Sequence, residues 1–321
     1  MLPATLKPCF GKARTMSVAK VNEHIYMIDV EVAGIRSFVA SYVLRGKNTV
    51  IVETGPASSV QNLIVGLRTL DVQPEEVAYV AVSHIHLDHA GGVGTLLRQL
   101  PKAKVVVHPR GAPHLANPEK LWQQSQLALG PIAEIYGKPE PVPPDKIVSA
   151  EDGMTLDAGN GVMLRVVETL GHASHHQSYY ELSSHSVFPG DAAGIYLNEL
   201  DVIVPTTPAP FRLDMALVSL EKLASLKPSA LYYTHFGKAD KALERLQVYA
   251  KQLKLWAKIA GEALKNGENL EVVSGKIAER DEAVKKAANY IRGHRVLGET
   301  LFKGSVFGVL DYVKNFGSVP A

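Results

Sequence analysis

The chain of 321 residues is long enough for about two average domains, or for one large layered domain with an appendage, which excludes peptides and disulfide-stapled miniproteins. It carries 34 Lys and Arg against 32 Asp and Glu and 46% hydrophobic residues, so it lacks the basic excess of proteins that bind nucleic acid or acidic membranes through charge alone. Its single cysteine, Cys9, excludes an intrachain disulfide and a cysteine-rich zinc cluster and is typical of a reducing compartment.

The first 18 residues lack the charged head and the apolar block of a secretion signal. Nowhere in the chain do about 18 apolar residues follow one another without interruption. We therefore expect a cytoplasmic protein without a membrane-spanning segment. Cys9 has no histidine or second cysteine nearby and is interpreted as an inert thiol.

From residue 21 onward, short β-branched runs alternate with turn signals, which predicts three successive strands over residues 24–32, 37–44 and 49–52. The apolar spacing then predicts, in order, a helix over 59–70, a strand over 77–82, a short helix over 94–100 and a strand over 103–107. Strands that alternate with helices in this way indicate an α/β arrangement.

Residues 109–144 differ in character, because they combine a helical piece over 121–129 with five prolines within residues 131–144, which exclude a central strand there. We interpret this segment, called the excursion below, as a surface feature that forms a wall of a substrate cleft. Further strands are predicted over 155–156, 162–169, 176–182, 187–188 and 230–233, with a helix over 214–226.

Beyond Gly237 the composition shifts to helix-forming residues. One amphipathic face is marked by Leu243, Leu246, Tyr249, Leu253, Trp256, Ala260 and Leu264. Residues 267–269 break this helix, and more helices follow to about residue 316. We expect the apolar face to pack on the sheet domain, with a lid or a dimer surface as the alternatives.

The segment Ser83-His84-Ile85-His86-Leu87-Asp88-His89-Ala90-Gly91-Gly92 places four ligand-type side chains within six positions, directly after the strand over 77–82. Residues two apart in an extended backbone project to the same side, so His84 and His86 can face one ion. Asp88 and His89 come where the chain turns at the glycines and can face a neighbouring ion. Without a cation, packing these groups together would leave polar atoms unpaired, so the segment predicts a metal site.

Three further candidate ligands follow predicted strands at once, each beside a small residue or glycine: His172, Asp191 and His235. The ends of strands are where α/β architectures place ligand-binding groups. Together, His84-x-His86-x-Asp88-His89, Gly171-His172, Gly190-Asp191 and Thr234-His235 resemble the ordered signature of the metallo-β-lactamase superfamily, particularly its glyoxalase II-like and lactonase-like hydrolases, over residues 20–237.

This resemblance implies a four-layer αββα sandwich in residues 1–237, followed by a helical C-terminal extension in residues 238–321. It also implies two divalent metal ions: His84, His86 and His172 hold one, Asp88, His89 and His235 hold the other, and Asp191 bridges them. Nitrogen and oxygen ligands without thiolate favour zinc, with iron or manganese as alternatives.

The activity implied by the resemblance is hydrolysis of a small ester-like substrate, a thioester or a lactone, with phosphotriesters as a further candidate. Two cations lower the pKa of a shared water from 15.7 toward about 7, and the bridging hydroxide is the nucleophile. Asp88 and Asp191 are the expected catalytic residues, Asp88 orienting the hydroxide and passing a proton to the leaving group.

The sequence leaves two other functions open: a mononuclear-iron oxidoreductase of the persulfide dioxygenase type and, less favoured, a phosphodiesterase or nuclease. The near-neutral charge argues against a nucleic-acid partner. β-lactam hydrolysis is disfavoured, because Asp191 stands where many true lactamases carry cysteine. The expected partner is a small-molecule substrate, and formation of a homodimer is left open.

One residue departs from the resembled pattern: Glu53 in Glu53-Thr54-Gly55 stands where many relatives have aspartate. We expect Glu53 to be a supporting or surface carboxylate that binds no metal. His175 and His176 are expected to support the site or to pack on a strand, and Tyr196 is expected in the core or at the rim. The other histidines given an ordinary structural interpretation are His24, His108, His114, His185 and His294.

Overall fold

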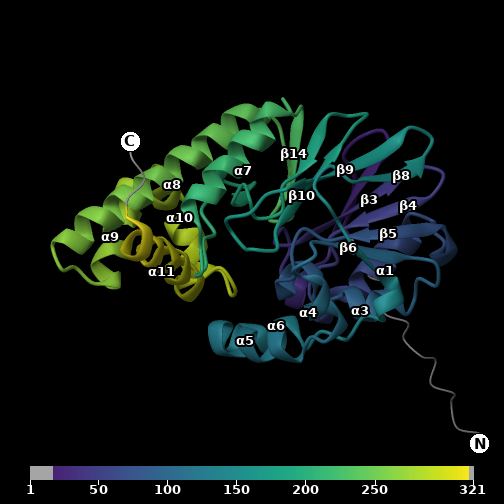
Figure 1. Cartoon of the computed structure of the whole chain (residues 1–321), viewed down its shortest axis with the longest axis horizontal. Coiled ribbons are helices and arrows are strands. Elements are labelled where there is room, and N and C mark those ends of the chain that lie inside the picture. The colour runs from purple at the N-terminus through teal and green to yellow at the C-terminus, as the bar shows by residue number, and fades with distance from the viewer. Residues whose placement is uncertain (1–16, 318–321) are drawn as a thin grey trace, which may run out of the picture.

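The computed structural model describes residues 17–317, apart from the side chain of Glu299, so the interpretation of Cys9 falls outside the described residues. Two β-sheets lie face to face, helices cover their outer faces, and a group of helices stands at one end of the sandwich (Figure 1). This arrangement confirms the expected αββα sandwich with C-terminal helices.

In the first sheet, the strands lie side by side in the order in which they occur along the chain. They are β1 (Val18–Lys20), β2 (Ile25–Asp29), β3 (Ala40–Arg45), β4 (Thr49–Val52), β5 (Val77–Ala81), β6 (Lys104–Val107) and β7 (Ile147–Ser149). Neighbours from β1 to β4 are antiparallel, and neighbours from β4 to β7 are parallel. The carboxyl ends of β4 to β7 therefore lie at one edge.

The second sheet has the order β15 (Gly237–Ala239), β14 (Ala230–Tyr233), β11 (Ser186–Phe188), β10 (Gln177–Glu181), β9 (Val162–Glu168) and β8 (Thr155–Gly159). A separate pair consists of β12 (Ile195–Leu197) and β13 (Val202–Val204). Strands β9 and β11 are both antiparallel to β10, and β11 is parallel to β14. Consequently β9, β11 and β14 run in the same direction and end at the same edge.

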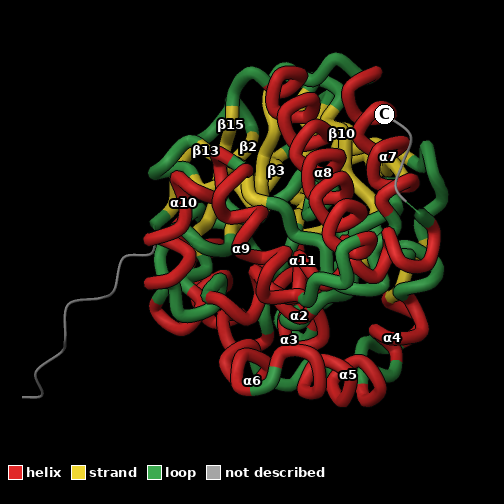
Figure 2. Tube along the Cα trace, turned by 90° about the vertical axis from the view of Figure 1, so that its left-hand side faces the viewer, coloured by secondary structure: helices red, strands yellow, loops and turns green. Residues whose placement is uncertain are grey.

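Helices occupy the outer layers and the C-terminal part of the chain (Figure 2). They are α1 (Val60–Thr69), α2 (Leu87–Ala90), α3 (Val93–Leu97), α4 (Ala112–Ala116), α5 (Glu119–Leu129), α6 (Pro131–Tyr136), α7 (Leu213–Ser225), α8 (Ala242–Lys265), α9 (Leu270–Arg280), α10 (Glu282–Gly293) and α11 (Glu299–Phe316). Four short 3-10 turns are η1 (Val32–Gly34), η2 (Ala57–Ser59), η3 (Pro74–Glu76) and η4 (Pro144–Lys146). Within residues 17–317, we find no helix that combines the length and the apolarity needed to cross a membrane.

Strand alternation sorts the apolar residues into two cores. Val50 and Val52 of β4 point between the sheets, where they join Leu164 of β9 and Tyr232 of β14. Ile51, between the two valines, points outward into the larger core that the helices share. Strand β4 is thus buried on both faces, which explains why it reads as a nearly continuous apolar run.

The two sheets also meet through hydrogen bonds at the edge where the parallel strands end. The Gln177 amide of β10 donates to the Ser83 carbonyl 2.8 Å away, and the Ala40 amide donates to the Thr234 carbonyl at 2.8 Å. Tyr42 donates its hydroxyl to the Tyr233 carbonyl at 2.6 Å. The first bond ties the loop after β5 to the second sheet, and the other two tie β14 and the residue after it to the first sheet.

Most expected elements form, and the differences are local. The strand expected over 37–44 begins only at Ala40, because Ser37 has a left-handed backbone and its amide donates to Asp29. Very short strands such as β1, β7 and β12 were not expected, since three residues carry too little pattern to be recognised. Strand β15 continues the second sheet beyond residue 237, while the division into two domains there stays a prediction.

The amphipathic face of α8 packs as expected along most of its length. Leu246, Tyr249, Leu253, Trp256 and Ala260 are buried, whereas Leu243 and Leu264 at its two ends are exposed. Helix α8 contacts α7, β13, α9 and α11, so its apolar face packs within the chain. The contacts with α7 and β13 fit the expected packing on residues 1–237, and the contacts with α9 and α11 add packing among the C-terminal helices.

Asp281 ties the C-terminal helices together. Its carboxylate accepts the Trp256 indole N–H at 2.7 Å and, as the N-cap of α10, the amides of Ala283 and Val284 at 2.9 and 3.2 Å. Gln252 of α8 donates to the same carboxylate at 3.2 Å. One buried side chain thus joins the long helix α8 to the start of α10.

Asp281→Ala is expected to lower the free energy of unfolding by about 3 kcal/mol, since it removes a helix cap and leaves the buried indole N–H of Trp256 without its acceptor. Urea unfolding followed by circular dichroism measures this change. Asp281→Asn keeps an acceptor oxygen for the cap and should lose clearly less. Equal losses in the two variants would contradict this account of Asp281.

Candidate metal centre

All seven side chains expected at a metal site lie together at the edge where the parallel strands end. His84 and His86 follow β5, Asp88 and His89 lie in α2, His172 follows β9, Asp191 follows β11 and His235 follows β14. The ligand-type atoms of His84, His86 and His172 all lie within 4.8 Å of one another, and so do those of Asp88, His89 and His235. A third group within this limit joins Asp191 to His84 and His89.

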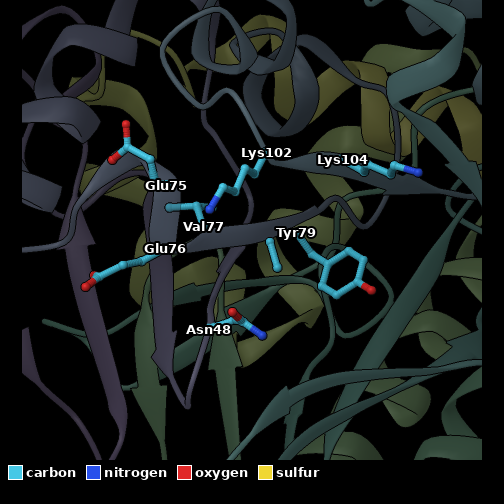
Figure 3. A pocket seen from close by; sticks show the side chains of 8 residues that line it. Asn48, Glu75, Glu76, Val77, Tyr79, Lys102 and Lys104 are labelled. Carbon is cyan, nitrogen blue, oxygen red and sulfur yellow. The ribbon is translucent and has the colours of Figure 1, made fainter.

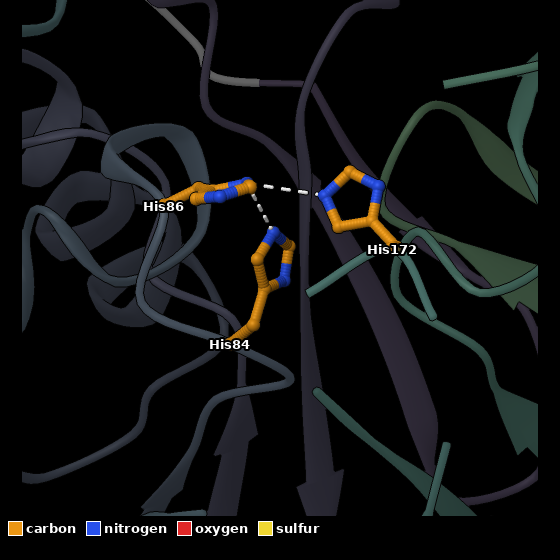
Figure 4. Close-up of side chains that lie close together, drawn as sticks. All are labelled: His84, His86 and His172. Carbon is orange, nitrogen blue, oxygen red and sulfur yellow. Dashed lines mark hydrogen bonds between the residues drawn. The ribbon is translucent and has the colours of Figure 1, made fainter. Parts of the chain in front are cut away.

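The first triad is a convergence of three imidazole nitrogens (Figure 4). His86 Nδ1 lies 2.9 Å from His84 Nε2 and 3.1 Å from His172 Nε2. The three rings come from two loops that are 86 positions apart in sequence. Such a set of nitrogen atoms directed at one point is the arrangement that a cation with imidazole ligands requires.

The second triad consists of Asp88, His89 and His235, and Asp191 links it to the first. Asp88 Oδ2 lies 3.4 Å from His235 Nε2. Asp191 Oδ1 lies 3.4 Å from His89 Nε2, and its Oδ2 lies 3.4 Å from His172 Nε2. The carboxylate of Asp191 therefore stands between the two triads, with one oxygen toward each.

Backbone carbonyls determine which nitrogen of two histidines faces the centre. His172 Nδ1 lies 3.0 Å from the Thr206 carbonyl, and His235 Nδ1 lies 2.8 Å from the Phe38 carbonyl. A carbonyl oxygen only accepts, so in each ring Nδ1 carries the proton. Their Nε2 atoms consequently present lone pairs to the centre when the rings are neutral, as a metal ligand must.

The C-terminal helices help to place one of these carbonyls. Thr207, next to Thr206, donates its hydroxyl to the Ser305 carbonyl of α11 at 2.7 Å. Gly308 of the same helix packs so closely on the Thr207 carbonyl that a side chain there would collide with it. Helix α11 therefore supports the segment that orients His172.

Glu53 supports the ligand loop, residues 83–89. Of its two expected roles, a supporting carboxylate or a surface carboxylate, the structure shows the first. Its side chain is 1% exposed, and its Oε1 accepts the Ser83 amide at 3.0 Å. Its Oε2 lies 3.4 Å from Nδ1 of His89. Glu53 has a φ of 64°, an uncommon conformation for a residue with a side chain, which brings the longer glutamate into reach.

His176 supports Asp191, which agrees with its expected role. Its Nε2 accepts the Asp191 amide at 3.1 Å, and its Nδ1 lies 2.9 Å from the Thr169 hydroxyl, which receives the ring proton. Gly190 precedes Asp191 with a φ of 53°, and a Cβ there would lie 2.6 Å from the Ser83 hydroxyl and 2.7 Å from His176. Only glycine fits this close turn.

The remaining candidates lie beside the centre or away from it. The His175 ring stacks on His84 at 6.2 Å between centroids, and the His294 ring packs on Phe38, which in turn contacts His235. Tyr196 donates its hydroxyl to Asp201, so it points to the α8 side of the molecule and not to the seven residues. His24, His108 and His185 contact Glu181, Glu168 and Tyr180, respectively.

Tyr136 of α6 reaches the centre without having been identified from the sequence. It is 2% exposed, and its hydroxyl donates to Asp88 Oδ2 at 3.5 Å. The expectation that the excursion walls a cleft offered a general hint, but no spacing pattern connects a residue in it to the ligand loop.

The residues fit a metal site. Among the ligand-type atoms, His89 Nε2 and Asp191 Oδ1 are buried without a hydrogen-bond partner. Within the described chain, the ion-pair partners of Asp88 and Asp191 are histidines, with no lysine or arginine among them. Buried carboxylates and imidazole lone pairs directed at common points are satisfied by positive charge placed between them.

Burial and neighbouring charges shift the pKa values of the ligand-type residues. Some histidines become harder to protonate, and His89 becomes easier to protonate. Burial, reinforced by the adjacent histidines, holds the pKa of His84 well below its ordinary value and lowers the pKa of His86 to about 3. Burial also opposes charge on His89, but Asp191, Glu53 and Asp88 outweigh it and raise the pKa of His89. Burial raises the pKa of Asp88, yet His89 and His235 outweigh it and bring this pKa to about 2.

These shifts predict that the metal-free protein loses stability as the pH falls below about 6.5. His84, His86, His172 and His176 have depressed pKa values, so in that range the unfolded chain binds protons that the folded chain does not. Each such histidine contributes a slope of about 1.4 kcal/mol per pH unit once fully developed. His89 and His235 have raised pKa values, so they contribute stability at low pH that is lost above pH 6.5.

Urea unfolding of chelator-treated protein between pH 4 and 9 measures this dependence, and we expect a maximum near pH 6.5. Added zinc should steepen the fall toward acid, because bound ligands must be deprotonated. A metal-free protein that gains stability on acidification from pH 6.5 to 5 would contradict the assignment of neutral histidines.

A surface hollow of about 280 Å³ lies at the start of β5, the end of this strand that is opposite to the ligand loop (Figure 3). It is distinct from the candidate metal centre. It is lined by Asn48, Glu75, Glu76, Val77, Ala78, Tyr79, Lys102 and Lys104. Two lysines offset two glutamates there, and the strand begins at this end, whereas the ligand loop follows its other end.

Comparison with known proteins places most of the sheet region in one family. The model of the metallo-beta-lactamase superfamily matches residues 34–235. The chain is 34% identical over 201 residues to the metallo-beta-lactamase fold-containing protein ST1585 of Sulfurisphaera tokodaii, which covers 61% of this chain and 72% of that protein. The crystal structure of ST1585 aligns with a TM-score of 0.60 and 31% identity over 68% of this chain and 80% of its own.

Two more distant structures share the fold alone. The metallo-beta-lactamase family protein TTHA1429 from Thermus thermophilus is 22% identical, with a TM-score of 0.64 over 88% of this chain and 90% of its own. The chemotaxis sensor ODP, solved as a peroxy diiron species, is 12% identical, with a TM-score of 0.52 over 74% of this chain and 94% of its own.

Proposed function

Because the chain belongs to the metallo-β-lactamase superfamily, we propose that it is a dinuclear metal-dependent hydrolase that acts on a small ester-like substrate. The observation that carries this proposal is the position of Asp191 between two triads of ligand-type atoms. His84, His86 and His172 would hold one cation, Asp88, His89 and His235 the other, and Asp191 would contact both. We expect zinc, with iron or manganese as alternatives.

When bound, two such cations supply an activated water at neutral pH and polarise the bond to be cleaved. The chain itself contributes the orientation of the ligands and the handling of protons. Asp88 is ionised at neutral pH, because its pKa is held at about 2, so it would present a charged oxygen to a cation in the second triad. The carbonyls of Thr206 and Phe38 hold the proton of His172 and of His235 on Nδ1. Because Nε2 of each ring is then free of a proton, both rings can bind a cation without changing tautomer.

Nucleophilic attack without a serine or cysteine is consistent with the composition of the centre, which consists of histidines and carboxylates. We propose a thioester or a lactone as the substrate class, with a phosphotriester as a further candidate. The rim near His175 and the excursion would then contact the substrate, and the protein would act on small molecules.

The test is elemental analysis of the purified protein together with a panel of thioester, lactone, phosphotriester and phosphodiester substrates. Near two equivalents of metal per chain with hydrolysis of an ester-like member supports the proposal. One equivalent of iron, with oxygen uptake and sulfite formed from a persulfide, would replace it with the oxygenase alternative. Hydrolysis of the phosphodiester alone would place the protein with the phosphodiesterases.

A further inference from the structure

Tyr136 is the last residue of α6, which belongs to the excursion, and it joins that excursion to the ligand loop. Its hydroxyl lies 3.5 Å from Asp88 Oδ2, across 48 positions of sequence. Helix α6 also contacts α2, the short helix that carries Asp88 and His89. The contact of Tyr136 with Asp88 is therefore part of a packed junction between two helices.

The Tyr136 hydroxyl makes this contact in the buried interior. Tyr136 is 2% exposed, and a buried tyrosine hydroxyl needs an acceptor. Asp88 Oδ2 is that acceptor, and the same oxygen lies 3.4 Å from His235 Nε2. The donor from Tyr136 thus restricts how the Asp88 carboxylate turns relative to His235.

Two further contacts hold the excursion together and close to the residues that follow Asp88. Gly94, just after the ligand loop, packs so closely on the Glu140 backbone that a side chain there would collide with it. The Val142 amide donates to the Leu115 carbonyl at 2.9 Å, which closes the excursion on itself. The segment that carries Tyr136 is thereby fixed against the loop that carries Asp88.

From this geometry we infer that Tyr136 is a positioning residue for the second triad: its hydroxyl holds the Asp88 carboxylate in the orientation that binds the second cation. The inference rests on the proposed two-cation centre. It assigns to the excursion a role in metal retention in addition to its proposed contact with the substrate. The first triad, which Tyr136 does not touch among its described contacts, should be independent of it.

Tyr136→Phe keeps the buried ring and removes only the hydroxyl. Zinc binding measured by chelator competition should show an unchanged first equivalent and a second equivalent weakened by about 10- to 100-fold, the usual loss when a hydrogen bond to a metal ligand is removed. At limiting zinc the kcat should fall by a similar factor, with KM changed by less than about 2-fold, since the substrate is not the partner of this hydroxyl.

The matched control is Tyr180→Phe, which removes a hydroxyl that bonds His185 in the turn after β10. It should leave both zinc affinities unchanged. A double-mutant cycle with Asp88→Asn tests whether Tyr136 acts through Asp88: once the carboxylate has been replaced by an amide, loss of the hydroxyl should add little. Full additivity in this cycle would overturn the inference.

A folded Tyr136→Phe protein with two wild-type zinc affinities would also overturn it. The inference and the proposed hydrolysis fail separately: if the wild type binds two cations and cleaves none of the esters while Tyr136→Phe loses the second cation, Tyr136 keeps its role and the hydrolase proposal falls. A wild type that binds a single cation overturns both.

Discussion

Asp191→Ala should reduce turnover of the ester-like substrate by more than about 100-fold, beyond the loss typical of a residue that only supports a ligand. The reason is its position: one carboxylate oxygen lies 3.4 Å from His89 and the other 3.4 Å from His172, so a single change removes a contact from both triads. Metal content, measured by elemental analysis, should fall below two equivalents per chain.

The fold should survive this substitution, because His176 bonds the Asp191 amide and not its side chain. Far-ultraviolet circular dichroism and a cooperative thermal transition check this point. Asp145→Ala, at an exposed carboxylate in η4, serves as the matched control and should keep both metal and activity. A well-folded Asp191→Ala protein with wild-type metal content and turnover would refute the ligand assignment.

Glu53→Gln is expected to weaken metal binding by about 10- to 100-fold, although Glu53 itself contacts no expected metal position. If the amide oxygen keeps the bond to the Ser83 amide, the new NH2 group faces Nδ1 of His89. That nitrogen must then accept, which moves the ring proton to Nε2, the atom directed at Asp191. His89 would hold the wrong tautomer for a ligand.

Zinc affinity by chelator competition measures this effect, and activity at limiting zinc should follow it. Glu53→Asp retains an acceptor-only carboxylate and should lose less than Gln if the tautomer is the cause. Glu75→Gln, an exposed glutamate in η3, is the control for charge alone. Wild-type zinc affinity in Glu53→Gln would show that Glu53 does not orient His89.

Much of the fold was predictable because its signals are local. Each parallel strand is a short apolar run ended by a polar residue or a glycine, and each helix of the outer layers has its own apolar spacing. Strands of three residues such as β12 and β15 were not predictable, since they form only where a neighbour offers free backbone groups.

Of the candidate centre, the sequence indicated the seven ligand-type side chains and their common edge. His172, Asp191 and His235 each follow a strand directly, and strands β9, β11 and β14 run in the same direction, so their ends had to meet. The role of Glu53 was only half predicted, because its burial depends on a left-handed turn and on the position of Ser83.

The sequence by itself indicated which side chains could bind a metal and that each of them follows a strand, because residue type and short apolar runs are local features. Only the tertiary structure decided where the protons sit and what holds each ligand. His172 takes its tautomer from the Thr206 carbonyl, His235 from that of Phe38, and Asp88 is held by Tyr136 from a separate helix. Every residue has a backbone carbonyl, so the choice of partner depends on where the folded chain passes and leaves no pattern in the sequence.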